Sequence, residues 1–181
     1  ETDNMQYTSK YVSPIGDILL ASDGAHLTGL WFERQKYFAD TLSGEHEEKN
    51  LPVFDETKRW LDLYFSSADP GFMPPLRPAG SPFRQKVWDI LLQIPRGSLL
   101  TYKEIADKIA AKRGLPRMSA QAAGGAVGHN PISILIPCHR VVGSDGSLTG
   151  YAGGIEKKIA LLKLEGAYTS RLKLPKKGAD F

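Results

Sequence analysis

A segment rich in proline and glycine, residues 68–80, divides the chain into two parts with different hydrophobic patterns. Before it, short apolar runs alternate with turn residues, a pattern typical of β-strands. After it, apolar residues recur every three or four positions, a pattern typical of amphipathic helices. We therefore predict an α+β protein with a domain over residues 1–75, a linker at 76–80, a second domain at 81–168 and a basic tail at 169–181.

The N-terminal part predicts an antiparallel meander covered by one helix. Three strands are expected within residues 7–12, 17–21 and 27–32, each followed by turn residues or a charged segment. Residues 54–65 have apolar side chains at helical spacing, so we expect an amphipathic helix that packs on the meander. The charged residues 45–49 are interpreted as a loop or the surface of a helix.

The C-terminal part predicts a mostly helical domain. Ser81 can cap a helix that begins at Pro82 and ends before Pro95. Thr101 and Glu104 have the spacing of a capping box at the start of a helix over residues 102–111. Ser119 can cap a second, short helix that extends to Val127. Helix, basic turn and short helix in this order predict a helix-turn-helix.

The second of these helices is made almost entirely of alanine and glycine. Two adjacent glycines, Gly124 and Gly125, cost a helix about 1 kcal/mol each relative to alanine, so a close approach of the backbone must be needed. Either a neighbouring helix or a DNA groove could require it. The basic turn at residues 112–117 favours DNA.

Charge is distributed unevenly over the 181 residues. Residues 1–75 contain six basic and thirteen acidic residues, which gives a net charge of −7. Residues 76–181 contain seventeen basic and seven acidic residues, which gives a net charge of +10. A basic half suggests a polyanionic partner, and the alternative is a solvated basic surface without one.

No apolar run approaches the roughly 20 residues that span a bilayer, and the N-terminus lacks the apolar core of a signal peptide. We expect an intracellular protein without a membrane partner.

Cys138, the only cysteine, is followed directly by His139. A thiol is a strong nucleophile only as the thiolate, and a nearby histidine can take or share its proton. The alternative is a small buried residue beside a core histidine. The apolar run at residues 132–136 predicts a buried strand that ends at Pro137 and presents Cys138 at its end. One cysteine and four scattered histidines do not have the spacing of a zinc site, so we predict no metal.

The motifs around this cysteine resemble those of the O6-alkylguanine-DNA alkyltransferases. They are Asn-Pro at 130–131, Pro-Cys-His-Arg-Val-Val at 137–142, Gly-Tyr-Ala-Gly-Gly at 150–154 and Leu-Leu-Lys-Leu-Glu-Gly at 161–166. The resemblance covers residues 81–166, about half of the chain. The N-terminal part is similar to the ribonuclease-H-like domain of this family in the order of its elements.

The resemblance implies a chemical role for four residues. Cys138 would take the alkyl group, His139 would act as a base through a water molecule, and Glu165 would orient the histidine. Asn130 would tie the recognition helix to the active-site segment. The thioether formed is not readily converted back to the thiol, so the protein would act once and without a cofactor. O4-alkylthymine is a further possible substrate.

The resemblance also implies binding residues and a partner, double-stranded DNA that contains O6-alkylguanine. The helix-turn-helix would enter the minor groove and extrude the damaged base, because sulfur cannot reach the O6 atom of a stacked guanine. Residues expected to bind the base are Tyr102, Val141, Ser147, Tyr151, Ala152 and Gly153. Residues expected to contact DNA are Thr101, Lys103, Arg113, Arg117, Gln121, Ala122, Gly124, Arg140 and Ser144. We expect a monomer that is cytoplasmic, or nuclear in a eukaryote.

Gln121 departs from the family pattern, because it occupies a position where many members have an intercalating arginine. Glutamine fills space but carries no charge and stacks less well than a guanidinium. Arg113 or Arg117, in a loop that is longer than in the best-known members, could compensate through phosphate contacts.

Three other functions remain open at this stage. A non-catalytic lesion-binding protein would share the helix-turn-helix but would lack the cysteine, so Cys138 argues against it. A transcription regulator would need bulkier side chains on its second helix to read base edges. A cysteine hydrolase would turn over ester or amide substrates and would ignore DNA.

Overall fold

The computed structural model describes residues 5–175, and the chain divides into two compact units. The first consists of Glu1–Ala79 and Pro131–Leu135, and the second of Gly80–Asn130 and Ile136–Phe181. Residues 1–4 and residues 176–181 of the predicted basic tail lie outside the described residues. No helix within residues 5–175 is long and apolar enough to cross a membrane.

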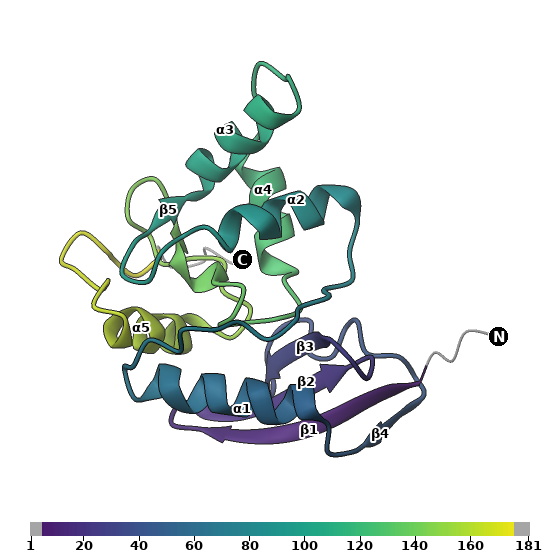
Figure 1. Ribbon diagram of the computed structural model, residues 1–181. Coiled ribbons are helices and arrows are strands. Elements are labelled where there is room, and N and C mark those ends of the chain that lie inside the picture. Colours follow the sequence, from purple (N-terminus) through teal and green to yellow (C-terminus); the bar gives the residue numbers. More distant parts are fainter. Residues whose placement is uncertain (1–4, 176–181) are drawn as a thin grey trace. The chain divides into compact units, whose positions relative to one another are not determined.

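The first unit is built on a four-stranded sheet with the order β3-β2-β1-β4 (Figure 1). Strands β1 (Gln6–Ser13), β2 (Gly16–Ser22) and β3 (Leu27–Phe32) pair antiparallel, which confirms the predicted meander. The charged segment predicted as a loop or helix surface instead contains β4 (His46–Glu48), which is parallel to β1. This prediction was wrong because a short edge strand whose residues are all exposed has no alternating apolar pattern.

Helix α1 (Pro52–Phe65) packs on this sheet, as predicted. Its buried face includes Phe54, Trp60, Leu61 and Tyr64, which recur at helical spacing. The rings of Trp60 and Tyr64 are stacked with centroids 5.2 Å apart. These aromatic side chains therefore belong to the core of the unit.

The apolar run at residues 132–136 does not form the predicted strand. Only Ile132 makes a bridge, to Leu30, and the chain then turns through Ile134 at φ 70°. A β-branched residue in this left-handed region is strained, at a cost of roughly 1–2 kcal/mol. The side chains of Ile132 and Ile134 are nevertheless buried. An apolar run bounded by turns indicates burial, and the backbone conformation here follows from tertiary contacts.

Within the described residues the second unit contains four α-helices, of which the first three correspond to the predicted ones. They are α2 (Pro82–Leu91), α3 (Tyr102–Lys112), α4 (Ala120–Gly128) and α5 (Ile155–Leu164). Ser81 and Ser119 accept hydrogen bonds from the backbone at the starts of α2 and α4, and the capping box of α3 has both of its bonds. Strands β5 (Leu100–Thr101) and β6 (Val141–Val142) pair parallel. The predicted caps are confirmed.

Helices α3 and α4 contact each other and α2, and they form the predicted helix-turn-helix (Figure 1). The small residues of α4 serve packing on one side: Ala123 and Ala126 are buried, and the indole of Trp88 donates to the Ala126 carbonyl over 2.9 Å. The other side of α4, with Gln121 and Ala122, is exposed. Tight helix packing thus accounts for one face of α4 and leaves the other free for a ligand.

Candidate functional site

Cys138 begins a single 3-10 turn, η1 (Cys138–Arg140), in the second unit. Its side chain is buried and forms no disulfide. Asn130, just past the end of α4, donates from Nδ2 to the Ile136 carbonyl over 2.8 Å and hydrogen-bonds to Cys138. Burial raises the pKa of the Cys138 thiol, and the bond from Asn130 opposes this shift. The side chain of Asn130 thus links the end of α4 to the reactive turn.

His139 and Glu165 form a fully buried pair in which Nε2 lies 2.7 Å from Oε2. Burial lowers the pKa of His139, so the neutral imidazole is favoured. Burial alone would raise the pKa of Glu165, but hydrogen bonds from His139 and Arg140 hold it well below its ordinary value. Because Nε2 donates to the carboxylate, Nδ1 carries the lone pair of the neutral ring. Within residues 5–175 this buried Nδ1 has no hydrogen-bond partner.

A buried lysine on α5 stands beside the same turn. Lys158 is fully buried, and its Nζ donates to the carbonyls of Val141 and Thr149 over 2.5 and 2.7 Å. Burial lowers the pKa of Lys158 to about 7, and the interaction with the Cys138 thiolate opposes this shift. Conversely, the ammonium lowers the pKa of the Cys138 thiol. The site therefore contains a buried amine that, in its protonated form, interacts electrostatically with the nucleophile.

A cavity of about 560 Å³ lies between the start of α3, the exposed face of α4 and the loop at residues 143–149. Tyr102 forms one wall, and its hydroxyl donates to the Thr149 carbonyl over 2.7 Å. Gly150, at φ 79°, permits this contact, because a Cβ there would lie 2.2 Å from the Tyr102 hydroxyl. The remaining lining residues are Ala120, Gln121, Gly124, Gly143, Ser144, Asp145, Ser147, Thr149 and Pro175.

Two protein families match this chain along most of its length. Residues 82–167 match the family described as "6-O-methylguanine DNA methyltransferase, DNA binding domain", and residues 6–78 match "6-O-methylguanine DNA methyltransferase, ribonuclease-like domain". The chain belongs to the methylated-DNA–protein-cysteine methyltransferase family. The predicted family and its α+β fold are confirmed.

Individual members of the family support this conclusion. The methylated-DNA–protein-cysteine methyltransferase of Haemophilus influenzae is 41% identical over 160 residues, which cover 88% of this chain and 86% of that protein. The Mycobacterium tuberculosis protein of the same name is 44% identical over 153 residues, with 84% and 88% covered. The crystal structure of Mycobacterium tuberculosis OGT in complex with DNA superposes with a TM-score of 0.75 at 41% identity and covers 93% of this chain and 94% of that one. The predicted methyltransferase activity agrees with this family.

The structure brings some of the predicted binding residues together and separates others. Tyr102, Gln121, Gly124, Ser144 and Ser147 all line the cavity. The backbone amide of Ser147, a residue expected to bind the base, already donates to the Asp145 carboxylate over 3.0 Å.

The glycine-rich segment at residues 150–154 lies beside His139. Tyr151 is buried, with its ring centroid 6.4 Å from that of His139. Ala152 and Gly153 are half-buried after it and do not line the cavity.

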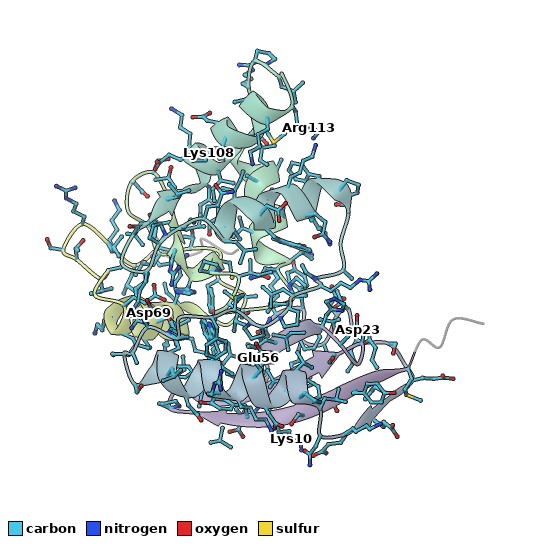
Figure 2. All side chains as sticks on the ribbon, viewed as in Figure 1. Lys10, Asp23, Glu56, Asp69, Lys108 and Arg113 are labelled. Atoms are coloured by element: carbon cyan, nitrogen blue, oxygen red, sulfur yellow. The ribbon has the colours of Figure 1, made fainter. Side chains whose placement is uncertain are left out.

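The predicted DNA contacts at the helix-turn-helix also differ in their surroundings. Thr101 uses its hydroxyl to cap α3, and Lys103 and Ala122 are exposed. Arg117 is exposed in the loop between α3 and α4, and the guanidinium of Arg113 lies 5.8 Å from the centre of the Phe83 ring (Figure 2 labels Arg113). These positions leave Lys103 and Arg117 accessible to a phosphate.

Arg140, also predicted to contact DNA, uses its guanidinium inside the protein. Nε and Nη2 donate to Glu165 over 2.7 and 3.0 Å, and Nη1 donates to the Ile94 carbonyl over 2.6 Å. A phosphate contact by this group would have to replace those bonds. The structure gives Arg140 a different position from the one expected, as part of the network that holds Glu165.

Lys158 was missed by the sequence analysis, although the sequence contained a signal. It lies three, four and seven residues before Leu161, Leu162 and Glu165, which places it on the buried face of α5. A lysine at such a position is usually solvated, so the spacing alone did not single it out.

Proposed function

We propose that this protein repairs O6-alkylguanine in double-stranded DNA by transferring the alkyl group irreversibly to Sγ of Cys138. The observation that carries the proposal is the single cysteine of the chain, held beside the buried His139–Glu165 pair. This arrangement provides a nucleophile, a base and a group that orients the base. A family member solved in complex with DNA supports DNA as the partner.

The residues of the second unit account for each step of the transfer. Nδ1 of His139 takes the thiol proton through a water molecule, and Sγ attacks the alkyl carbon of the substrate. The S–C bond forms as the C–O6 bond breaks, and the guanine keeps the electron pair of that bond. The Tyr102 hydroxyl, at the cavity wall, would exchange its bond to the Thr149 carbonyl for one to the leaving base, and this bond makes the base a better leaving group. The thioether product has no ready way back, so each molecule acts once.

The extruded base would be held largely by backbone groups. The carbonyls of Cys138 and Val141 are the proposed acceptors, and the amides of Tyr151 and Ala152 are the proposed donors. Lys158 already donates to the Val141 carbonyl. A carbonyl oxygen has two lone pairs, so it can accept a second bond from the base.

The exposed face of α4 would enter the minor groove, where its lack of bulk suits a narrow space. Lys103 and Arg117 would contact phosphates and fix the orientation of the protein without reading the sequence.

The proposed catalytic residues all belong to one unit of one chain, which supports action as a monomer. A DNA substrate supports a cytoplasmic location, or a nuclear one in a eukaryote. O4-alkylthymine is proposed as a second substrate.

Intact-mass measurement tests the function directly. Wild-type protein is mixed with an equimolar duplex that contains O6-methylguanine, with Cys138→Ser as the control. We expect one added methyl group, located on Cys138, and restored guanine in the DNA. Tight lesion binding without a mass change would make this a recognition protein. Turnover of esters or amides without any effect on DNA would indicate a hydrolase.

Gln121 is predicted to support extrusion of the base. It is exposed on α4 and lines the cavity beside Tyr102. We expect Gln121→Ala to slow methyl transfer from duplex DNA about tenfold, equivalent to about 1.4 kcal/mol, because the space left by the extruded base stays unfilled. Transfer from the free base O6-benzylguanine, measured in parallel, should keep its wild-type rate. Equal slowing with both substrates would contradict a role in extrusion.

A further inference from the structure

The segment at residues 171–175 follows the part of the chain that matches the family's DNA-binding domain, yet it packs firmly on the second unit. Leu172 is 8% exposed and joins a cluster of buried side chains. The other members of that cluster are Val142, Leu148, Leu162 and Ala167. This part of the predicted basic tail therefore belongs to the folded second unit.

This segment is fixed to the loop that lines the cavity. The Leu148 amide donates to the Lys173 carbonyl over 2.9 Å, and the Lys173 amide donates to the Gly146 carbonyl over 3.0 Å. Gly146 has φ 86°, and a Cβ there would lie 2.2 Å from the Arg171 carbonyl oxygen. Only glycine permits so close an approach. The loop and the segment thus form one structure.

Two side chains of the segment reach the cavity or its rim. Pro175 lines the cavity together with Tyr102 and Gln121. Lys173 is half-exposed, and its Nζ lies 3.5 Å from the carboxylate of Asp145, which also lines the cavity. Hydrogen bonds from the Ser147 hydroxyl and amide hold the pKa of Asp145 at about 2, so the carboxylate is ionised at neutral pH. Without a cation beside it, this charge would repel DNA phosphates at the cavity rim.

We propose that the segment at residues 171–175 is part of the DNA-binding surface, where Lys173 neutralises Asp145 and contacts a backbone phosphate next to the extruded nucleotide. This proposal rests on the proposed function, because it needs DNA at the cavity. The group that Lys173 would recognise is a phosphodiester of the DNA backbone. Lys173 is anchored by its own backbone bonds and by the neighbouring Leu172, so the point from which its side chain extends over the cavity rim is fixed before DNA arrives.

The test compares the salt dependence of DNA binding. Fluorescence anisotropy is measured on a labelled duplex that contains O6-methylguanine, with Cys138→Ser as the parent so that no transfer occurs. Lys173→Met is compared with Lys10→Met, which removes an exposed lysine from β1 in the first unit (Lys10 is labelled in Figure 2). One lost phosphate contact should reduce the slope of log K against log salt concentration by about 0.9. The Lys10 variant should keep the parent slope.

A double variant tests the neutralisation. Asp145→Asn keeps an oxygen that can accept from Ser147, so the loop should keep its conformation. Added to Lys173→Met, it should recover part of the lost affinity without restoring the slope. An unchanged slope for Lys173→Met would overturn the phosphate contact, and no recovery in the double variant would overturn the neutralisation. Methyl transfer by the wild-type protein is measured separately by mass, so a failure of the proposed function would be distinguished from either result.

Discussion

Glu165→Gln is expected to lower the free energy of unfolding by about 3 kcal/mol, because removing one partner of a buried ion pair costs roughly 3–5 kcal/mol. The Glu165 side chain is fully buried and accepts hydrogen bonds from His139 and from two nitrogens of Arg140. Arg140 is itself only 11% exposed. Glutamine keeps the shape of the side chain but leaves this guanidinium without a countercharge.

The same variant is expected to slow methyl transfer about a hundredfold, within the roughly 10²–10⁴ that general acid–base catalysis contributes. The carboxylate accepts from Nε2 of His139 and so keeps the lone pair on Nδ1. It also stabilises the imidazolium that forms when Nδ1 takes a proton. A neutral amide can present either an oxygen or an N–H to the ring, so it neither fixes the tautomer nor offsets the charge.

The stability difference between wild type and Glu165→Gln should shrink in acid. The pKa of Glu165 is held below its ordinary value in the folded protein, so below an unfolded pKa of about 4.3 the unfolded chain binds the proton first. The stabilisation from Glu165 is therefore present above that pH and is lost as the pH falls. The pKa of His139 is also lowered by burial, so its contribution declines below about pH 6.5, the unfolded value.

Thermal unfolding from pH 2 to pH 8 and single-turnover transfer rates measure these effects. Glu156→Gln, an exposed glutamate in the first turn of the same helix, is the matched control and should change neither quantity. A wild-type transfer rate in Glu165→Gln would show that the His139–Glu165 pair is structural only. A stability difference that stays constant from pH 5 down to pH 2 would contradict the depressed pKa of Glu165.

The features that sequence predicted best are those decided within a few residues. The capping box of α3 depends on Thr101 and Glu104 alone, and the meander depends on turns next to its strands. The resemblance around Cys138 also indicated His139 and Glu165, which the structure places 2.7 Å apart although they are 26 positions apart in the sequence. Their pairing was predicted from the family motifs, because a local sequence pattern cannot indicate a contact between residues so far apart.

The features that sequence missed are decided by long-range contacts. Residues 132–136 are apolar enough for a strand, but hydrogen bonds to Leu30 and the turn at Ile134 determine their conformation. Arg140 carries a charge that could face DNA, and only the position of Glu165 and of the Ile94 carbonyl shows that it faces inward. Lys158 is likewise assigned to the site by its contacts with two carbonyls far from it in sequence.

Lys158→Met is expected to slow methyl transfer at pH 7 by about tenfold or more, because a rise of one unit in the pKa of the thiol reduces the thiolate fraction about tenfold. The buried ammonium lowers the pKa of Cys138, and methionine fills a similar volume without charge. The effect on stability should be small by comparison. Burial lowers the pKa of Lys158 to about 7, so burying this charge is itself unfavourable near neutral pH, which offsets the loss of its two hydrogen bonds.

The pKa of Cys138 is the quantity that separates an electrostatic role for Lys158 from a purely structural one. Thiolate absorbance near 240 nm can be followed from pH 6 to pH 11, and because the chain has one cysteine, subtracting Cys138→Ser removes all other signals. We expect Lys158→Met to raise this pKa and Lys163→Met, an exposed lysine on the same helix, to leave it unchanged. The rate deficit of Lys158→Met should narrow at high pH, where both proteins carry the thiolate. An unchanged pKa with a reduced rate would restrict Lys158 to holding the carbonyls of Val141 and Thr149 in place.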